Sequence, residues 1–115
     1  MNKIRIIRNE DVDRVLIGVP EGHKHLRISM KLKNGLVLIF QEATIANILR
    51  AYTTVKTHPN IRAQELEMKT LTADLRKDGY AIHQLLETHR KNEEVESELK
   101  KLLENRSPLS KSSQL

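Results

Sequence analysis

The sequence predicts an α+β fold, in which an N-terminal antiparallel β-meander of three to four strands is followed by two to three α-helices. Three observations support this prediction. Apolar and polar residues alternate in the first forty positions, an Asn-Gly pair separates two apolar runs, and the apolar spacing changes to a helical period after residue 41. Strands in one run and helices in another are typical of α+β proteins rather than of parallel α/β sheets.

Two strands are expected before the hairpin that contains the Asn-Gly pair. Residues 3–7 alternate basic and apolar side chains, which indicates a strand with one wet face. Residues 14–19 are mostly β-branched or apolar, which favours a more buried strand. Pro20-Glu21-Gly22 should end that strand.

The Asn34-Gly35 pair predicts a tight two-residue hairpin turn, because both residues tolerate positive φ. The strand before it, 26–33, alternates apolar and polar positions, so one face should be buried and Arg27 and Lys31 should be exposed. The return strand, 36–40, is apolar at every position, which predicts a central strand that is covered on both faces, at least in part. The positions expected to be buried on the first strand are Leu26, Ile28, Met30 and Leu32.

Helical spacing begins near residue 42. Apolar residues at 45, 48, 49, 52 and 55 predict a first helix that Thr44 could cap and that His58-Pro59 should end. A second helix is expected from about Ile61, with Met68, Leu71 and Leu75 as its stripe.

The C-terminal part is expected to hold the remaining helical segments. Gly79 could stop the second helix, and a third should begin near Tyr80 and carry Ile82, Leu85, Leu86 and His89. Asn92, followed by two glutamates, could begin a fresh helix. We expect one domain over residues 1–106, with its β part in 1–41 and its helical part in 42–106. Residues 107–115 are rich in Ser and predict a disordered tail.

Composition narrows the classes of protein. The 115 residues suit one domain, and the absence of cysteine excludes disulfides, thiolate metal sites and cysteine nucleophiles. A small domain without disulfides favours a reducing compartment, so we expect a soluble cytoplasmic protein. No apolar run approaches the roughly 20 residues that cross a bilayer, and the first residues lack the apolar run of a signal peptide, so no membrane partner is expected.

No motif for catalysis or for a cofactor is present in the sequence. The four glycines are too scattered for a phosphate-binding loop, so we expect no cofactor and assign no catalytic residue. His23 and His25 with Glu21, and His83 with Glu87, have spacings that a metal can use. The two histidines have no defined third ligand, so we interpret residues 21–25 as a solvated loop and strand entry. The His83–Glu87 spacing is equally that of a surface hydrogen-bonded pair, and we predict no metal site. A small enzyme with an unrecognised acid–base site remains a second alternative.

The net charge of +5 lies in the first part of the chain. Residues 1–60 carry ten Lys or Arg and five Asp or Glu, whereas residues 61–115 carry ten of each. If the first and third strands share a sheet, their basic side chains gather on one face that could bind phosphates. The same charges could equally serve solubility and deter edge pairing. The candidate nucleic-acid-binding residues are Lys3, Arg5, Arg27, Lys31 and Lys33.

A second nucleic-acid hypothesis uses the helices. Two helices joined by Thr57-His58-Pro59-Asn60 have the dimensions of a helix-turn-helix motif. Glu65 and Glu67 lie among the groove-facing candidates and would repel phosphates. Those groove-facing candidates are Arg62, Gln64, Lys69, Thr70 and Thr72.

The last apolar stripe consists of Val95, Leu99 and Leu102, at heptad-like spacing and flanked by charges. It is out of phase with the preceding stripe, so one straight helix could not bury both. We therefore predict a non-enzymatic interaction module that self-associates as a homodimer through Val95, Leu99 and Leu102. The alternative is a nucleic-acid-binding protein that uses the basic sheet face.

Overall fold

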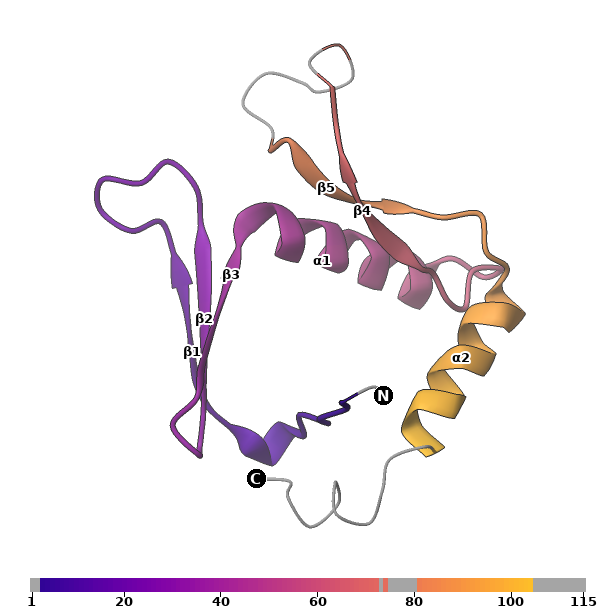
Figure 1. The fold of residues 1–115 in the computed structure, drawn as a ribbon, viewed down its shortest axis with the longest axis horizontal. Helices are drawn as coiled ribbons and strands as arrows, with labels where there is room; N and C mark the ends of the chain where they lie inside the picture. Colours follow the sequence, from indigo (N-terminus) through magenta and orange to yellow (C-terminus); the bar gives the residue numbers. More distant parts are fainter. Residues whose placement is uncertain (1–2, 73, 75–80, 105–115) are drawn as a thin grey trace. The chain divides into compact units, whose positions relative to one another are not determined.

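The computed structural model of the chain describes residues 3–72, 74 and 81–104. It confirms an α+β protein, but strands and helices alternate more than the sequence predicts (Figure 1). The elements are a 3₁₀ turn (Asn9–Asp11), β1 (Val12–Gly18), β2 (Arg27–Leu32), β3 (Val37–Gln41), α1 (Glu42–Thr57), β4 (Leu66–Thr70), β5 (His83–Glu87) and α2 (Asn92–Glu104).

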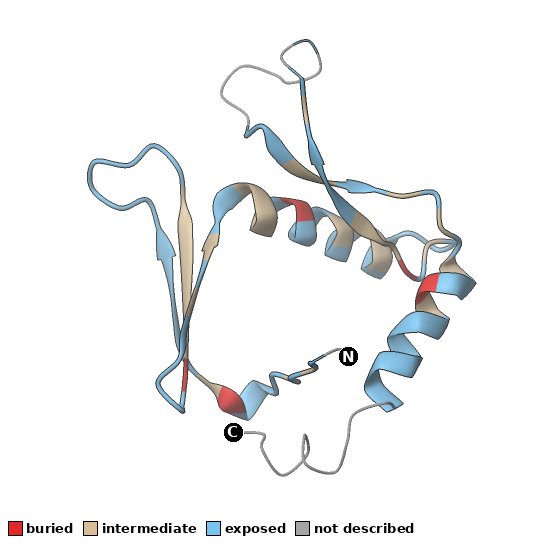
Figure 2. Cartoon of the chain, in the orientation of Figure 1, coloured by how far each residue is buried: buried red, intermediate tan, exposed pale blue. Residues whose placement is uncertain are grey.

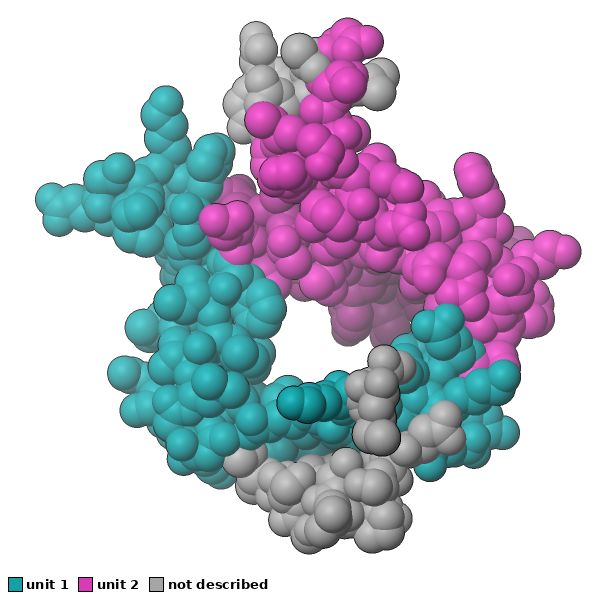
Figure 3. Space-filling model, viewed as in Figure 1, with its two compact units in different colours: residues 1–40, 98–115 teal, residues 41–97 magenta. Residues whose placement is uncertain are grey.

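The chain divides into two compact units, residues 1–40 with 98–115 and residues 41–97 (Figure 3). The first unit holds β1, β2 and nearly all of β3, and the second holds α1, β4 and β5. The prediction of one domain over residues 1–106 stays a prediction. The predicted tail, 107–115, and the predicted helix break at Gly79 lie outside the described residues.

The first unit is built on an antiparallel sheet in the order β1–β2–β3. Val15 of β1 lies opposite Met30 of β2, and Ile17 lies opposite Ile28. A bulge interrupts the pairing near Asp13, where Val12 already lies opposite Leu32. Residues opposite each other in an antiparallel pair share a face, so this register decides which side chains gather on each side of the sheet.

The hairpin between β2 and β3 forms where the Asn-Gly pair predicts it, but its turn is longer than expected. The Leu32 N–H donates to the Leu36 carbonyl at 2.8 Å, and the Gly35 N–H donates to the Leu32 carbonyl at 2.9 Å. Gly35 has φ of 97°, whereas no described non-glycine residue has a positive φ. A three-residue loop with a left-handed glycine at its last position therefore replaces the predicted two-residue turn.

Burial on this sheet differs from the prediction (Figure 2). Leu32 is fully buried, but Leu26, Ile28 and Met30 are only half-buried, as are Arg27 and Lys31, which were expected to be exposed. The expectation of a more buried strand at 14–19 is wrong, because every residue of β1 after Val12 is exposed. The expectation of a central return strand with cover on both faces is also wrong, because β3 lies at the end of the strand order and its Val37 and Ile39 are exposed.

Residues 3–8 do not form the predicted first strand, although they keep its alternation. Ile4 and Ile6 are half-buried, while Lys3 and Arg5 are exposed. The following 3₁₀ turn is fixed by Asp11, whose carboxylate accepts the Arg8 N–H at 2.9 Å. The Asp11 carbonyl also accepts the Lys33 N–H at 2.9 Å, which ties this turn to the β2–β3 loop. The meander therefore has three strands.

Helix α1 has the predicted end but buries a different face. It begins at Glu42 after Gln41 rather than at a Thr44 cap, and it ends at Thr57 before His58-Pro59. The buried residue on this helix is Asn47, whose Nδ2 donates to Oε1 of Gln84 on β5 at 2.8 Å. Three residues of the predicted apolar stripe, Ile48, Leu49 and Tyr52, are exposed.

The helices predicted from Ile61 and from Tyr80 do not form. Residues 66–70 and 83–87 pair instead as an antiparallel hairpin, with Met68 opposite Leu85. On a helix Glu65 and Lys69 would lie one turn apart and could pair. In the strand the Lys69 ammonium instead contacts Glu67 at 2.6 Å, and the Glu65 carboxylate contacts Arg90 at 2.8 Å. This correction removes the helix-turn-helix hypothesis, because no second helix follows α1 in that segment.

Helix α2 begins at Asn92, with Glu93 and Glu94 in its first turn, as the sequence predicts. The side chain of Asn92 forms hydrogen bonds with residues 60–63, which are distant in the sequence. Its Oδ1 accepts the backbone N–H groups of Arg62 at 3.1 Å and Ala63 at 3.2 Å, and its Nδ2 donates to the Asn60 carbonyl at 2.9 Å. The start of α2 is thereby bound to residues 60–63 within the second unit.

Candidate functional site

The predicted nucleic-acid residues fall in three different places. Arg27 and Lys31 lie on one face of β2, Lys33 lies in the turn that follows, and Lys3 and Arg5 lie outside the sheet. The expectation that all five share one sheet face depends on a strand at residues 3–7, and this strand does not form. The structure brings together only Arg27 and Lys31 of this set.

The register adds a basic residue that the sequence interpretation missed. Arg14 of β1 lies directly opposite Lys31, and Gly18 lies opposite Arg27. The apolar run at 14–19 predicts a buried strand and gives no sign that its first residue, Arg14, joins a basic face. We define the basic face as Arg14, Leu16 and Gly18 of β1 with Arg27, Ser29 and Lys31 of β2.

Two charges on the basic face have contacts that hold them in place. The Arg27 Nη1 donates to the carbonyls of His25 and Leu26, both at 3.3 Å. The Lys31 ammonium lies 3.9 Å from the Asp13 carboxylate, and both side chains are more than two-fifths exposed. The Lys31–Asp13 ion pair is exposed and contributes little to stability, so a partner can replace Asp13 at Lys31 at little cost.

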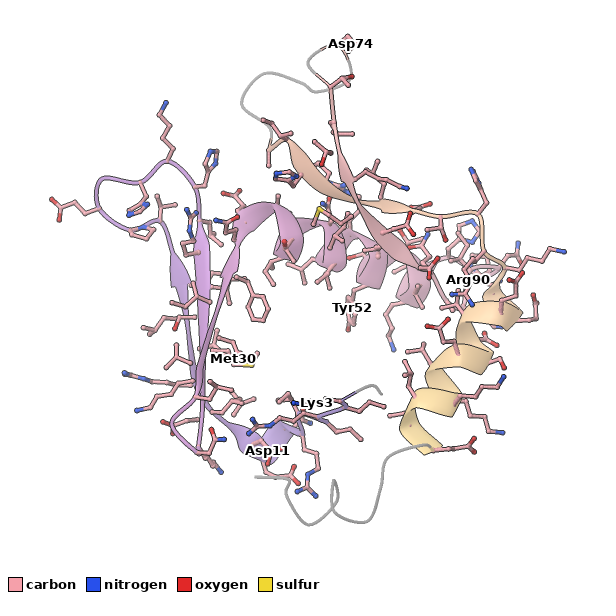
Figure 4. All side chains as sticks on the ribbon, in the orientation of Figure 1. Lys3, Asp11, Met30, Tyr52, Asp74 and Arg90 are labelled. Carbon is pink, nitrogen blue, oxygen red and sulfur yellow. The ribbon has the colours of Figure 1, made fainter. Side chains whose placement is uncertain are left out.

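The opposite side of the sheet is apolar. Val15 and Ile17 of β1 lie on it with Ile28 and Met30 of β2, and Ile17 keeps 65% of its surface exposed. The Leu32–Leu36 hydrogen bond sets the β3 register, which places Leu38 and Phe40 on this side as well. Figure 4 shows the Met30 side chain extending from β2. We call this set of six residues the apolar face.

A hollow of about 330 Å³ opens at the C-terminal end of β1. It is formed by the end of β1, the two residues that follow it and two residues of β2, so it lies wholly within the first unit. Most of its lining residues are apolar, and Arg27 and Ser29 are the polar residues among them. The lining residues are Leu16, Ile17, Gly18, Val19, Pro20, Arg27 and Ser29.

The predicted oligomer stripe on α2 is only partly available. Val95 is 7% exposed, so its side chain is already covered within the chain. Leu99 and Leu102 are exposed, and Leu103 joins them with 57% of its surface exposed. Leu103 follows Leu99 by four residues, a spacing that places both on one side of a helix and that the sequence interpretation overlooked.

Several charged side chains before and at the start of α2 form ion pairs. The Arg62 guanidinium donates to Glu96 at 2.8 Å and to Glu93 at 3.1 Å, and these contacts raise the pKa of Arg62. The Arg90 guanidinium and the Thr88 hydroxyl lower the pKa of Glu65, to which they donate. Arg90 is labelled in Figure 4. These pairs fix residues 60–65 against the residues before and within the start of α2, and we assign them a structural role.

The potential metal ligands do not converge in the part of the chain that the structure describes, where no group of three or more His, Cys, Asp or Glu could hold an ion. His83 contacts Thr70 across the β4–β5 pair, with 3.2 Å between Nδ1 and Oγ1. Within the described ranges, no helix is both long and apolar enough to cross a membrane.

The fold and these surfaces define a small α+β protein with exposed apolar and basic faces. No protein-family model matches the chain, and comparisons with characterised proteins and with solved structures give no match either. The functional argument therefore depends on the surfaces themselves.

Proposed function

We propose that this protein is a non-enzymatic interaction module that self-associates through helix α2. The observation that supports this proposal is the imbalance between buried and exposed apolar side chains. Among the described residues, the buried hydrophobic ones are Leu32, Ala63 and Val95, whereas seventeen large hydrophobic residues are exposed. A chain with so little core gains stability when another surface covers its apolar side chains.

The stripe on α2 has the properties of such a surface. Leu99, Leu102 and Leu103 are exposed on one helix, and burying each leucine side chain is worth roughly 1.5–3 kcal/mol. The segment 98–104 contains two glutamates and two lysines, so two copies are not held apart by net charge. A second copy supplies an identical stripe, and two identical patches can meet about a twofold axis.

The proposed homodimer can be tested by changing Leu99 and Leu102 together to Lys. Two charges in place of two leucines should prevent the stripe from being buried against a second copy. The wild type should show a dimer mass in size-exclusion chromatography with light scattering and a melting temperature that rises with protein concentration. The variant should have the monomer mass and a lower melting temperature that no longer depends on concentration.

A matched control changes Ile48 and Leu49 on α1 to Lys, which alters two other exposed apolar residues in the same way. This control should keep the dimer mass if α2 forms the interface. A wild type that is monomeric at every concentration contradicts self-association, and a control that dissociates as fully as the α2 variant contradicts the assignment to α2.

Binding of nucleic acid through the basic face is the alternative function. The position of Arg14 opposite Lys31 favours it, because this pairing adds a third cation to the face that holds Arg27 and Lys31. Phosphate groups would bind such a face by charge and would release counterions. The exposed Leu16 between these cations argues against it, since a phosphate backbone would leave this side chain unused.

The alternative predicts that Arg27→Ala combined with Lys31→Ala weakens binding of DNA or RNA. The slope of log affinity against log salt should flatten by about one unit for each phosphate that the variant no longer neutralises. Fluorescence anisotropy with a labelled oligonucleotide at several salt concentrations measures both effects. The variant Lys100→Ala with Lys101→Ala removes the same charge elsewhere and should bind like the wild type. Unchanged affinity in the first variant would exclude the basic face as the binding site.

A further inference from the structure

Strand β1 is an edge of the first sheet. The sheet order is β1–β2–β3, and among the described residues no strand pairs with the outer side of β1. An edge strand presents backbone N–H and C=O groups that an additional strand can bind. β1 is seven residues long, which is enough to hold a short extended segment along its whole length.

Most of this edge lacks the features with which proteins usually prevent pairing. Charged side chains, proline and bulges are the common means of protecting an edge. Here the bulge lies at the start of β1, near Val12 and Arg14, and Pro20 lies after its end. The stretch 15–19 between them carries no charge and is exposed at every position. This stretch is therefore open to strand addition.

The two faces of the sheet determine which added strand fits. An added strand places alternate side chains on opposite faces, where they meet those of β1. Its side chains on the basic face would lie near Arg14 and Leu16, with Arg27 and Lys31 one strand further away. Its side chains on the apolar face would lie near Val15 and Ile17. A segment that alternates acidic and apolar residues matches both faces.

The hollow at the end of β1 gives this surface a further point of recognition. It lies beside the edge strand, and its lining includes Leu16, Val19 and Pro20 together with Arg27. Pockets beside an edge strand commonly select side chains of an added peptide, while the backbone hydrogen bonds supply affinity. An acidic side chain could reach Arg27 while its carbon chain contacts the apolar lining.

We propose that β1 binds an extended segment of a partner protein by strand addition, and that this segment alternates acidic and apolar residues. Strand addition needs backbone donors and acceptors in the partner, which a nucleic acid does not have. It also uses the exposed apolar side chains of β1, which phosphates would leave uncovered. This site uses residues of β1 and β2, whereas the proposed self-association uses residues of α2.

A peptide probe tests the proposal directly. The probe is a fluorescein-labelled heptapeptide of alternating Glu and Val with blocked ends, and its matched control alternates Lys and Val. The full-length protein should bind the Glu-Val peptide in fluorescence anisotropy, more weakly at high salt, and should bind the Lys-Val peptide at least about tenfold more weakly. Replacing the central Val of the probe by Pro removes one backbone N–H and should weaken binding about tenfold. Hydrogen exchange should slow at residues 14–18 when the probe is bound.

Charge reversal on the protein provides the second arm. Arg14→Glu combined with Arg27→Glu should invert the preference, so that the Lys-Val peptide binds better than the Glu-Val peptide. Lys3→Glu with Arg5→Glu makes the same charge change outside the sheet and should retain the original preference. The single variant Ile17→Lys places a charge on the stretch 15–19, as edge strands that resist pairing commonly do. It should reduce binding of the Glu-Val probe about tenfold or more.

Several outcomes would overturn the proposal. These are the absence of binding of the Glu-Val peptide, equal binding of the Pro-containing probe, and slowed exchange only at residues outside 14–19. Displacement of the probe by an oligonucleotide that binds more tightly through Arg27 and Lys31 would favour the nucleic-acid function instead. The Leu99→Lys, Leu102→Lys variant should still bind the Glu-Val probe, so loss of self-association and loss of strand addition can be told apart.

Discussion

Leu32→Ala is expected to lower the free energy of unfolding of the first unit by about 2–5 kcal/mol. Leu32 is 0% exposed and is the one large apolar side chain among the described residues that is fully buried. Truncation removes apolar contacts and leaves a cavity that its neighbours fill only in part. Since small domains are stable by only about 5–15 kcal/mol, this loss should be large enough to increase opening of the sheet.

Hydrogen exchange followed by mass spectrometry measures this effect element by element. Exchange in β1 and β2 should accelerate strongly in Leu32→Ala, whereas exchange in β4 and β5 should change little. Leu16→Ala is the matched control, because it is the same substitution at a side chain that is 57% exposed. If both variants accelerate exchange equally, Leu32 is not the core residue of this sheet.

Asn92→Ala is expected to release the start of α2 from residues 60–63, at a cost of about 1–3 kcal/mol. The substitution removes one acceptor that serves two backbone N–H groups and one donor that serves the Asn60 carbonyl. Loss of the partner of the Ala63 N–H should account for most of this free-energy cost, because Ala63 is buried and water cannot replace the acceptor. Thermal unfolding followed by circular dichroism should show a lower melting temperature and less helix.

Asn92→Asp separates the two halves of this interaction. Aspartate keeps oxygen acceptors for the N–H groups of Arg62 and Ala63 but loses the donor to Asn60. Its melting temperature should therefore lie between those of the wild type and Asn92→Ala. A melting temperature of Asn92→Ala equal to that of the wild type would show that these hydrogen bonds do not hold α2 in place.

Local chemistry was sufficient to predict some elements. The Asn34-Gly35 pair located the β2–β3 hairpin, because few sequences allow the left-handed conformation that Gly35 adopts. His58-Pro59 located the end of α1, because a residue before proline disfavours helix. Asn92 with two glutamates located the start of α2. Each of these signals acts within a few residues along the chain.

The β4–β5 hairpin could not be found in the same way. Residues 61–77 have apolar spacings that fit a helix, but Leu66, Met68 and Thr70 also alternate with Glu67 and Lys69, as a strand requires. Residues 66–70 form a strand rather than a helix because they pair with residues 83–87, and this cross-strand pairing outweighs the local preference for helix. This pairing is not visible in either segment alone.

The candidate surfaces also depend partly on local sequence and partly on contacts between distant segments. By itself the sequence determined that the positive charge lies in the first part of the chain, that β2 has a polar and an apolar side, and that leucines recur on the last helix. The tertiary structure decided that Arg14 joins Lys31 on one face, that Lys3 and Arg5 lie outside the sheet, and that Val95 is covered while Leu99 is not. The physical reason is that charge and periodicity are properties of single residues and short segments. Strand register and burial depend instead on which distant segments meet.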